Sequence, residues 1–353
     1  MSLKELNEYT GVERNLIGLF GIDAGNYDTK SRHNTFTSGL TLKRVRNCLS
    51  NDFIQFSGSK VYYVLSSEPN PAWENKTESE DMFVMTMFAI AKEALARGIS
   101  ICQKEEIVLS IGMPPGDFNK ANVEKYKQYY ESRKNVSFNY GDTLFDFVIE
   151  SVVVTAQCWG AAAQYSTLIK DYDEVLLCDI GGLTTDNFKM TKVDGSQKID
   201  SSSIVSKGTG IKTLLNKIAN GLRDLSGLDM QFSQVNGILK GTRKPFGLVE
   251  KDFQLISDLK YEFVDELFTN IRMNGDDLKI LPIVFLGGGA ALLENEIKEV
   301  ATEQKACEYK IIKDSRANAI GYETIAAAGK YHISKKTIDA FWNDFESSLS
   351  DTN

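Results

Sequence analysis

Two segments of the chain carry an aspartate at the same place in a similar pattern. In GIDAGNYDTK (21–30) and CDIGGLTTD (178–186), an apolar run ends at Asp23 or Asp179, and glycine follows two residues later. Carboxylate oxygens are ligands that Mg²⁺ prefers, and this ion keeps several of its waters. Backbone N–H groups in glycine turns can approach phosphate closely because no Cβ is in the way. The two segments therefore predict a magnesium and phosphate site, with both aspartates as metal ligands.

Each turn has a simpler explanation when it is taken alone. Glycine after a strand usually only permits the positive φ angle of a turn. A third glycine turn, FLGGGAALLENE (285–296), also follows an apolar run, and three such turns make the simple explanation less favourable. Donors could come from the Thr184 and Thr185 hydroxyls or the Asn26 amide. Lys30 could neutralise a phosphate or lie in solvent.

The composition argues against several other kinds of site. The 353 residues include five cysteines without CxxC spacing and only two histidines. This argues against a disulfide framework, a zinc site and a histidine-based triad. Neither GxxxxGK[ST] nor GxGxxG is present, so P-loop and Rossmann sites are not supported. The net charge of −8 argues against direct nucleic-acid binding, and the longest apolar run is too short to span a membrane.

The apolar runs before the glycine turns are predicted to be buried strands, the first over residues 16–23. Each half of the chain begins with strand, aspartate and glycine, continues through a meander of strands, and ends with strands and helices. Such an order predicts α/β domains, and the length favours two of them. We expect one domain from residues 1–165 with about 320–353, and the other from residues 166–319.

Three local predictions complete this outline. Residues 1–15 are a polar leader to which the pattern assigns no structure. A helix over 81–98 is expected to follow a cap at Thr77 or Ser79. The small residues of CWGAAAQYSTLI (158–169) predict a single closely packed helix.

The complete set of segments resembles the actin-like ATPase superfamily, which also includes heat-shock chaperones and sugar kinases. The resembling segments are GIDAGNYDTK and CDIGGLTTD for the two phosphate loops, VVVTAQCWGAA (152–162) and ANAIGYETIAA (317–327) for the connecting segments, and FLGGGAALL for the adenosine loop. IVLSIGMPP (107–115) and the ANAIGY ending further resemble ParM-type plasmid-segregation actins. The resemblance implies an actin-like α/β fold: two related domains, each with a mixed five-stranded sheet and helices, around a nucleotide cleft.

The resemblance also implies roles for individual residues. Asp23 and Asp179 would bind the Mg²⁺ that bridges the β- and γ-phosphates. Gln157 falls where actins carry the glutamine that orients the attacking water, whereas many ParM relatives have glutamate there; the alternative is a helix-capping amide. Leu286 would border the adenine. The resemblance assigns no role to Asp186, which could simply cap a helix or lie in a turn. The nucleotide would be held by Gly25, Asn26, Lys30, Gly181, Gly182, Thr184, Gly208, Gly210, Gly287, Gly288 and Gly289.

The implied function is slow ATP hydrolysis coupled to a cytoplasmic filament that segregates plasmid DNA. The expected cofactors are Mg²⁺ and ATP, with GTP left open. The expected partners are further copies of the chain and a DNA-binding adaptor protein that links them to the plasmid centromere. Two alternatives on the same fold are a kinase of the sugar or acetate type and a non-polymerising nucleotide sensor. The basic turn KGTRKPFG (240–247) and the acidic tail after Lys330 could make filament contacts or be solvated charged surfaces.

Overall fold

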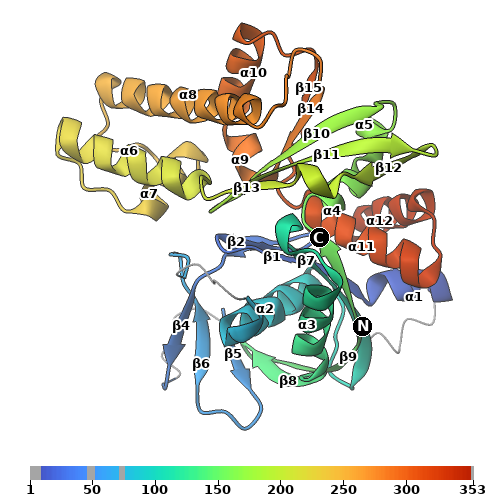
Figure 1. Ribbon diagram of the computed structural model, residues 1–353. Coiled ribbons are helices and arrows are strands. Elements are labelled where there is room, and N and C mark those ends of the chain that lie inside the picture. The colour runs from blue at the N-terminus through green and yellow to red at the C-terminus, as the bar shows by residue number, and fades with distance from the viewer. Residues whose placement is uncertain (1–8, 46–51, 71–75, 351–353) are drawn as a thin grey trace. The chain divides into compact units, whose positions relative to one another are not determined.

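The structure of the protein is a computed structural model (Figure 1). It describes residues 9–45, 52–70 and 76–350. Cys48 and the first eight residues of the expected leader lie outside these ranges. In the part of the chain that the structure describes, no helix has both the length and the apolar character needed to cross a membrane.

The chain divides into two compact units. Unit 1 contains Met1–Tyr165 and Arg316–Asn353, and unit 2 contains Ser166–Ser315. Each unit has its own mixed sheet and its own cluster of buried apolar side chains. The two units therefore have separate hydrophobic cores.

The sheet of unit 1 is centred on five strands. These are β1 (Leu19–Ala24), β2 (Asp28–Lys30), β3 (Thr35–Thr37), β7 (Glu105–Met113) and β9 (Thr143–Ala156). They lie in the order β3-β2-β1-β7-β9. β1 is antiparallel to β2 and parallel to β7, and β7 is parallel to β9. Because parallel strands end at the same edge of a sheet, β1 brings Asp23 next to the ends of β7 and β9.

The sheet of unit 1 continues beyond the five strands that the sequence led us to expect. The additional strands are β8 (Asn135–Tyr140), β5 (Phe53–Phe56), β6 (Tyr62–Leu65) and β4 (Leu40–Lys43). They follow β9 in this order and make a nine-stranded sheet. The extension arises because β9 is 14 residues long. Its first half pairs with β8 while its second half pairs with β7.

The expected polar leader contains a helix that the sequence interpretation missed. Helix α1 (Gly11–Ile17) begins with a capping box. The Thr10 N–H donates to Glu13 Oε2 at 2.6 Å, and the Glu13 N–H donates to Thr10 Oγ1 at 3.3 Å. A threonine followed three residues later by a glutamate is a sequence signature of a helix start, so this spacing could have predicted α1. The prediction of a strand over residues 16–23 was wrong at its start, because the helix occupies the first positions and β1 begins at Leu19.

Helix α2 (Glu80–Ala96) lies where the sequence predicted a helix. Its N-cap is Ser79, one of the two expected candidates, whose Oγ accepts the Asp81 N–H at 3.2 Å. The chain leaves the helix through Gly98, which has a φ angle of +65°. The remaining described helices of unit 1 are α3 (Lys120–Glu131), α4 (Trp159–Gln164), α11 (Ala317–Tyr331) and α12 (Lys335–Ser350), with short 3-10 turns at Lys76–Glu78 and Pro115–Asp117.

Glycines allow α11 to lie directly on the sheet of unit 1. A Cβ on Gly21 of β1 would lie 2.2 Å from a carbonyl oxygen of α11, and one on Gly112 of β7 would lie 2.0 Å from a tyrosine hydroxyl of α11. A Cβ on Gly321 of α11 would lie 1.8 Å from a carbonyl oxygen of α4. Such distances are far inside van der Waals contact, so only glycine permits this packing. The second connecting segment is therefore fixed against the strand that carries Asp23.

Unit 2 repeats the order of the central strands of unit 1. Its strands are β10 (Glu174–Ile180), β11 (Thr185–Val193), β12 (Ser196–Ile199), β13 (Val205–Lys207), β14 (Ile283–Leu286) and β15 (Tyr309–Ile311). The order is β12-β11-β10-β14-β15, and β13 also pairs with β11. β10 is antiparallel to β11 and parallel to β14. β10 therefore corresponds to β1, and the prediction of two related α/β domains is confirmed.

Helices cover the sheet of unit 2. They are α5 (Ser166–Ile169), α6 (Ile211–Ser226), α7 (Phe232–Leu239), α8 (Glu250–Met273), α9 (Gly287–Leu292) and α10 (Glu294–Glu303), with a 3-10 turn at Ser201–Ser203. The long helix α8 packs against α6 and α10 (Figure 1). The prediction of one helix over residues 158–169 was wrong. The chain forms α4 and α5 instead, because it passes from unit 1 to unit 2 between Tyr165 and Ser166.

A fully buried arginine joins the elements of unit 1 that surround β1. Arg97 Nε donates to Glu93 at 2.8 Å, and one terminal nitrogen donates to Glu323 of α11 at 2.6 Å. The other terminal nitrogen donates to two carbonyl oxygens, at Ile17 and Leu19, each at 2.8 Å. Buried charges destabilise a protein unless they are fully paired. The arginine therefore holds α1, α2, α11 and the start of β1 in one network.

Replacing Arg97 by methionine would leave two buried carboxylates without their shared cation. We expect Arg97→Met to lower the free energy of unfolding by about 3–5 kcal/mol, measured by urea denaturation. Arg223→Met is the matched control, because the Arg223 side chain is 56% exposed beside Asp229 and should contribute less than about 1 kcal/mol. Equal losses in the two variants would contradict the proposed importance of the buried network.

Glu93 should also make unit 1 sensitive to acid. Burial by itself raises the pKa of Glu93, but the charge of Arg97 and hydrogen bonds from His33 and Ser31 outweigh burial and hold the pKa well below its ordinary value of 4.5. A carboxyl with a depressed pKa contributes stability above its unfolded pKa, and this contribution is lost as pH falls through the folded pKa. We expect the free energy of unfolding to fall below pH 4.5, and to fall less steeply in Glu93→Gln. Equal slopes in urea titrations of both proteins would refute this assignment.

Candidate functional site

The first candidate site lies in unit 1, where β1 ends. Asp23 is 3% exposed and stands opposite Lys30 in the hairpin of β1 and β2. Lys30 Nζ lies 3.4 Å from Asp23 Oδ2, and the lysine side chain is only 15% exposed. Lys30 is therefore a partly buried neighbour of the carboxylate rather than a solvated surface lysine. The pair brings one positive charge to the end of the central strand.

Gln157 also contacts Asp23. Its Nε2 donates to Asp23 Oδ1 at 3.1 Å. Because a carboxylate only accepts hydrogen bonds, the NH₂ group of the amide must face Asp23. The Gln157 Oε1 has no hydrogen bond within the described residues. The alternative of a helix-capping amide is not what the structure shows, since Cys158 is the N-cap of α4.

Asn318 fixes the backbone next to Gln157. Its Oδ1 accepts the Cys158 N–H at 2.9 Å and the Ala161 N–H at 3.1 Å, and so caps α4 from α11. Cys158 has a φ angle of +66°, which costs a residue other than glycine of order 1–3 kcal/mol and requires support from its surroundings. Asn318 is thus a positioning residue that the sequence interpretation did not single out, although it lies within the ANAIGYETIAA segment.

The hairpin after Asp23 is tight and contains a buried polar atom without a partner. A Cβ on Gly25 would lie 2.6 Å from the Asp28 carbonyl oxygen, so this turn needs glycine. Within the described residues, Asn26 Oδ1 and Thr155 Oγ1 are buried and make no hydrogen bond. An unsatisfied buried polar atom costs free energy, so both atoms fit a site that a ligand or water completes. Thr155 lies on β9, two residues before Gln157.

The second candidate site lies in unit 2, where β10 ends. Asp179 is 9% exposed, and Gly287 at the start of α9 has a φ angle of +89°. A Cβ on Gly287 would lie 2.2 Å from Asp179 Oδ1. Only glycine therefore lets the carboxylate lie against the first turn of α9.

Asp186, which the sequence left unassigned, lies opposite Asp179 across β10 and β11. It is a strand residue rather than a cap or turn residue. It accepts a hydrogen bond from Thr184 Oγ1 at 2.9 Å, so the Thr184 hydroxyl is held within the loop. The Thr185 hydroxyl donates to the Thr209 carbonyl oxygen at 2.7 Å. In this structure both hydroxyls therefore support the loop itself.

The electrostatics at the end of β10 favour a cation. Burial raises the pKa of the Cys178 thiol well above its ordinary value, and the negative charges of Asp179 and Asp186 raise it further. The thiol therefore stays protonated and is not a nucleophile. The same two charges would stabilise a metal ion bound at Asp179.

The glycine loop after β10 is fixed by the start of α6. The Ile211 N–H donates to the Gly181 carbonyl oxygen at 3.0 Å, and the Lys212 N–H donates to that of Gly182 at 2.8 Å. The first N–H groups of a helix have no partner within the helix. These two bonds therefore give the first N–H groups of α6 their acceptors and also hold the loop in place. A Cβ on Gly210, the N-cap, would lie 2.6 Å from the Gly182 carbonyl oxygen.

The other predicted glycines of unit 2 differ in what surrounds them. A Cβ on Gly289 would lie 2.3 Å from Ile180, so this glycine lets α9 pack on the end of β10. A Cβ on Gly208 would have no atom within 4 Å, and one on Gly288 would meet only Ser315 at 4.0 Å. Gly208 and Gly288 thus leave open surface on which a nucleoside could lie, and their role stays a prediction.

The donor set fits a nucleotide with Mg²⁺. Each unit presents a largely buried aspartate beside a glycine loop, and unit 1 adds the orphaned oxygen of Asn26. Among the described residues, no group of three or more histidines, cysteines, aspartates and glutamates could hold a metal ion. Mg²⁺ needs only one or two carboxylates because it keeps several waters and also binds substrate phosphates. Taken separately in its own unit, each aspartate therefore fits Mg²⁺ better than a metal that requires a full protein cage.

No protein-family model matches the chain, and no curated protein matches its sequence at a significant level. Solved structures do match. The archaeal actin homologue Ta0583 has a TM-score of 0.69 at 17% identity, and the match covers 88% of this chain and 99% of that one. The fold is actin-like.

ParM-type structures match as well. ParM of Bacillus thuringiensis with ATP has a TM-score of 0.62 at 14% identity, covering 89% of this chain and 99% of that one. The Alp12 filament structure has a TM-score of 0.60 at 17% identity, covering 89% and 98%. The expected resemblance to actin-like and ParM-type proteins is therefore confirmed at the level of fold.

The contrast between Gly210 and Gly208 can be tested by adding one methyl group to each. Gly210→Ala should shift the glycine loop after β10, because the new Cβ would lie 2.6 Å from Gly182, and should lower the melting temperature by several degrees. Gly208→Ala is the matched control and should melt like the unmodified protein, since its Cβ meets open space. Differential scanning calorimetry of both variants gives the comparison. A Gly210→Ala protein as stable as the control would contradict the close contact.

Proposed function

We propose that this protein is an ATP-dependent, filament-forming actin-like protein that binds Mg²⁺ and ATP through the glycine loops after β1 and β10. The observation that carries the proposal is the duplicated element: two sheets of the same order, each with a largely buried aspartate and a glycine loop at the end of the equivalent strand. It is supported by two neighbours in fold, Ta0583, which has been solved in complex with ADP, and Bacillus thuringiensis ParM, solved with ATP. The same loops could accept GTP, because they would meet phosphate rather than base.

Residues of both units would bind the phosphates and Mg²⁺. Mg²⁺, when bound, would neutralise charge on the β- and γ-phosphates, with Asp23 and Asp179 as its protein ligands. Lys30 would add a positive charge beside Asp23, from which it is 3.4 Å away. The N–H groups of the glycine loops and Asn26 would bind and orient the phosphate oxygens.

Gln157 would orient the water that attacks the terminal phosphate. Its NH₂ group donates to Asp23, which fixes the plane of the amide and leaves Oε1 to accept a hydrogen bond from water. An amide has no basic site comparable to a carboxylate, so Gln157 positions the water without taking its proton. This chemistry predicts slow hydrolysis, as with the water-positioning glutamines of GTPases.

Assembly would follow nucleotide binding. The Alp12 neighbour was solved as a filament, and a head-to-tail contact that does not close builds an open helical polymer. We propose that such a filament acts in the cytoplasm to segregate plasmid DNA. The net charge of −8 does not favour direct contact with DNA, so the proposal includes a DNA-binding adaptor protein that joins the filament to the plasmid centromere.

Gln157→Ala should separate nucleotide binding from hydrolysis. With Mg²⁺ and ATP, we expect this variant to polymerise as the unmodified chain does, and to release phosphate at least about tenfold more slowly. Its polymers should persist longer, as followed by light scattering, phosphate release and electron microscopy. Gln128→Ala is the matched control, because Gln128 lies on α3 and contacts only an exposed glutamate among the described residues.

The same assay with the unmodified chain tests whether the protein forms filaments at all. If it forms no polymer with any nucleotide over a range of salt, the filament function is refuted, and binding without assembly would indicate a nucleotide sensor. Transfer of phosphate to a sugar or to acetate would indicate a kinase. If Gln157→Ala hydrolyses ATP at the unmodified rate, Gln157 does not orient the water.

A further inference from the structure

The three most exposed large hydrophobic side chains among the described residues lie near the two ends of α8. Phe246, just before this helix, is 79% exposed; Met273, its last residue, is 78% exposed; and Ile280, in the loop that follows, is 81% exposed. The helix has 24 residues, which separates its ends by about 36 Å. A single exposed apolar side chain is ordinary on a protein surface, so these residues matter here only together with the charged surfaces around them.

The residues before α8 form a basic surface, which we call the basic turn (Lys240–Gly247). Every residue of this segment is exposed. Arg243 and Lys244 make no ion pair with any described residue, and no carboxylate stands among the eight residues of the turn. The turn thus combines unpaired positive charge with the exposed ring of Phe246.

The residues after α8 border an acidic hollow of about 480 Å³ in unit 2. The acidic and basic residues of its lining are Asp171, Asp173, Glu174, Asp276, Asp277 and Lys189. Lys189 lies 3.6 Å from Glu174 and 3.3 Å from Asp276. Asp171 and Asp173 are exposed and have no cation partner among the described residues. Five carboxylates therefore share a single lysine, and Ile280 is part of the same lining.

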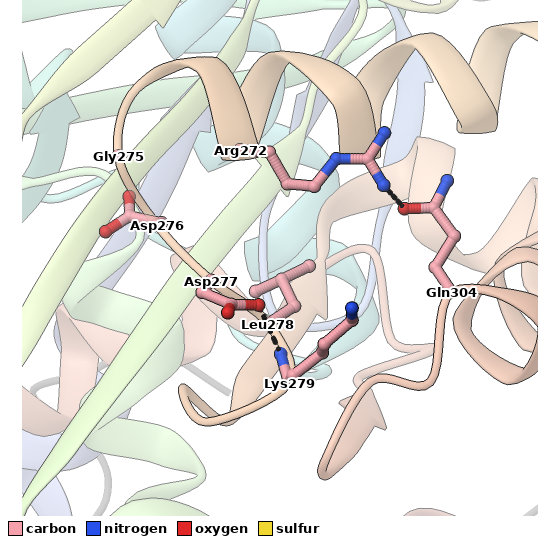
Figure 2. Close-up of a pocket in the computed structure, with 7 residues that line it drawn as sticks. All are labelled: Arg272, Gly275, Asp276, Asp277, Leu278, Lys279 and Gln304. Carbon is pink, nitrogen blue, oxygen red and sulfur yellow. Dashed lines mark hydrogen bonds between the residues drawn. The ribbon is translucent and has the colours of Figure 1, made fainter.

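Figure 2 shows the turn that joins α8 to this hollow. Arg272 points toward Gln304 and donates a hydrogen bond to it, while the Asp276 carboxylate points to the other side of the turn. Arg272 lines an adjoining pocket together with Asp276 and Asp277, but among the described residues it makes no ion pair with either carboxylate. Asp277 accepts the Lys279 N–H at 3.0 Å, which fixes the turn without adding a positive side-chain contact.

We propose that the basic turn of one copy of the chain docks on the acidic hollow of the next copy. Arg243 and Lys244 would meet Asp171 and Asp173, and Phe246 would cover the apolar surface around Ile280. This contact rests on the proposed polymerisation and names the surfaces that would carry it.

A second copy of the chain is the partner that these two surfaces specify. The surfaces are complementary in charge and each carries exposed apolar area, as stable contacts require. They cannot meet within one molecule, because they lie at opposite ends of a rigid helix of 24 residues. When two different surfaces of identical chains bind each other, each added copy leaves one surface open for the next. Such a contact builds a filament unless the rotation between neighbouring copies closes a ring.

The test exchanges the charges of the two surfaces in the full-length chain. Arg243→Glu with Lys244→Glu gives a variant in which both surfaces are acidic. Asp171→Lys with Asp173→Lys gives one in which the hollow has no net charge and presents two new lysines to the basic turn. Each variant alone, with Mg²⁺ and ATP, should show a critical concentration at least about tenfold higher than the unmodified chain. An equimolar mixture should co-assemble, because the unmodified turn of the second variant meets the unmodified hollow of the first, and the acidic turn of the first meets the lysines introduced into the hollow of the second. Added salt should weaken this assembly.

The control carries the same change of charge as the first variant, at another place in the chain. Lys120→Glu with Lys134→Glu reverses two exposed lysines of unit 1 that make no ion pair with described residues, and should assemble normally. Pelleting, light scattering and electron microscopy report the outcome. If the unmodified chain assembles and both exchanged variants assemble equally well, or if their mixture shows no recovery, this contact is overturned while the proposed function stands. If the unmodified chain fails to assemble, the proposed function falls and the contact falls with it.

Discussion

A buried carboxylate at the end of a central strand is the constraint on which the candidate site of each unit depends. Burying an ionised carboxylate costs free energy unless cations or hydrogen-bond donors meet it. In unit 1, Asp23 is met by Lys30 and by the amide of Gln157. In unit 2, Asp179 lies against Gly287, where any side chain would collide with it. The hairpin lysine, the oriented glutamine and the glycine turns are therefore consequences of placing an acid at that point of the sheet.

The two units share the order of their central strands but stabilise the site in different ways. In unit 1, the buried network of Arg97, Glu93 and Glu323 joins β1 to α1, α2 and α11. The same helix α11 supplies Asn318, which supports the strained backbone beside Gln157. In unit 2, the N–H groups at the start of α6 bind the loop after β10. The catalytic proposal for Gln157 thus depends on packing in unit 1, whereas the loop after Asp179 depends on a helix terminus.

Local patterns were sufficient to predict the parts of the fold that depend on neighbouring residues. The two strands that carry Asp23 and Asp179 next to their last residues, and the Ser79 cap of α2, all follow from short stretches of sequence. Helix α1 was missed even though its Thr10 cap is local, because its polar composition obscured the short amphipathic helix.

The remaining features require chain segments that are distant in sequence to meet. Arg97 and Glu323 are 226 residues apart, and Gln157 is 134 residues from Asp23. The pairing of β5 with β8, which widens the sheet, also joins segments that are far apart in the sequence. Periodicity and turn residues do not indicate which distant segments of the chain will pair. Of the two charged surfaces near the ends of α8, only the basic turn was recognised in the sequence. The acidic hollow gathers residues from segments that are distant in sequence, so it appears only in the fold.

The most direct test of the account is a calorimetric titration of ATP into the protein, kept below the concentration at which it assembles. The titration is done with Mg²⁺ and with EDTA, for the unmodified chain and for Asp23→Asn and Asp179→Asn. The account predicts that binding depends on Mg²⁺ and that each substitution weakens it by at least about tenfold, or about 1.4 kcal/mol. Each substitution removes one negative charge at the end of one central strand, so both units are tested separately. Equal affinity with and without Mg²⁺, or unchanged affinity in either variant, would contradict the assignment of these two aspartates to the metal and nucleotide.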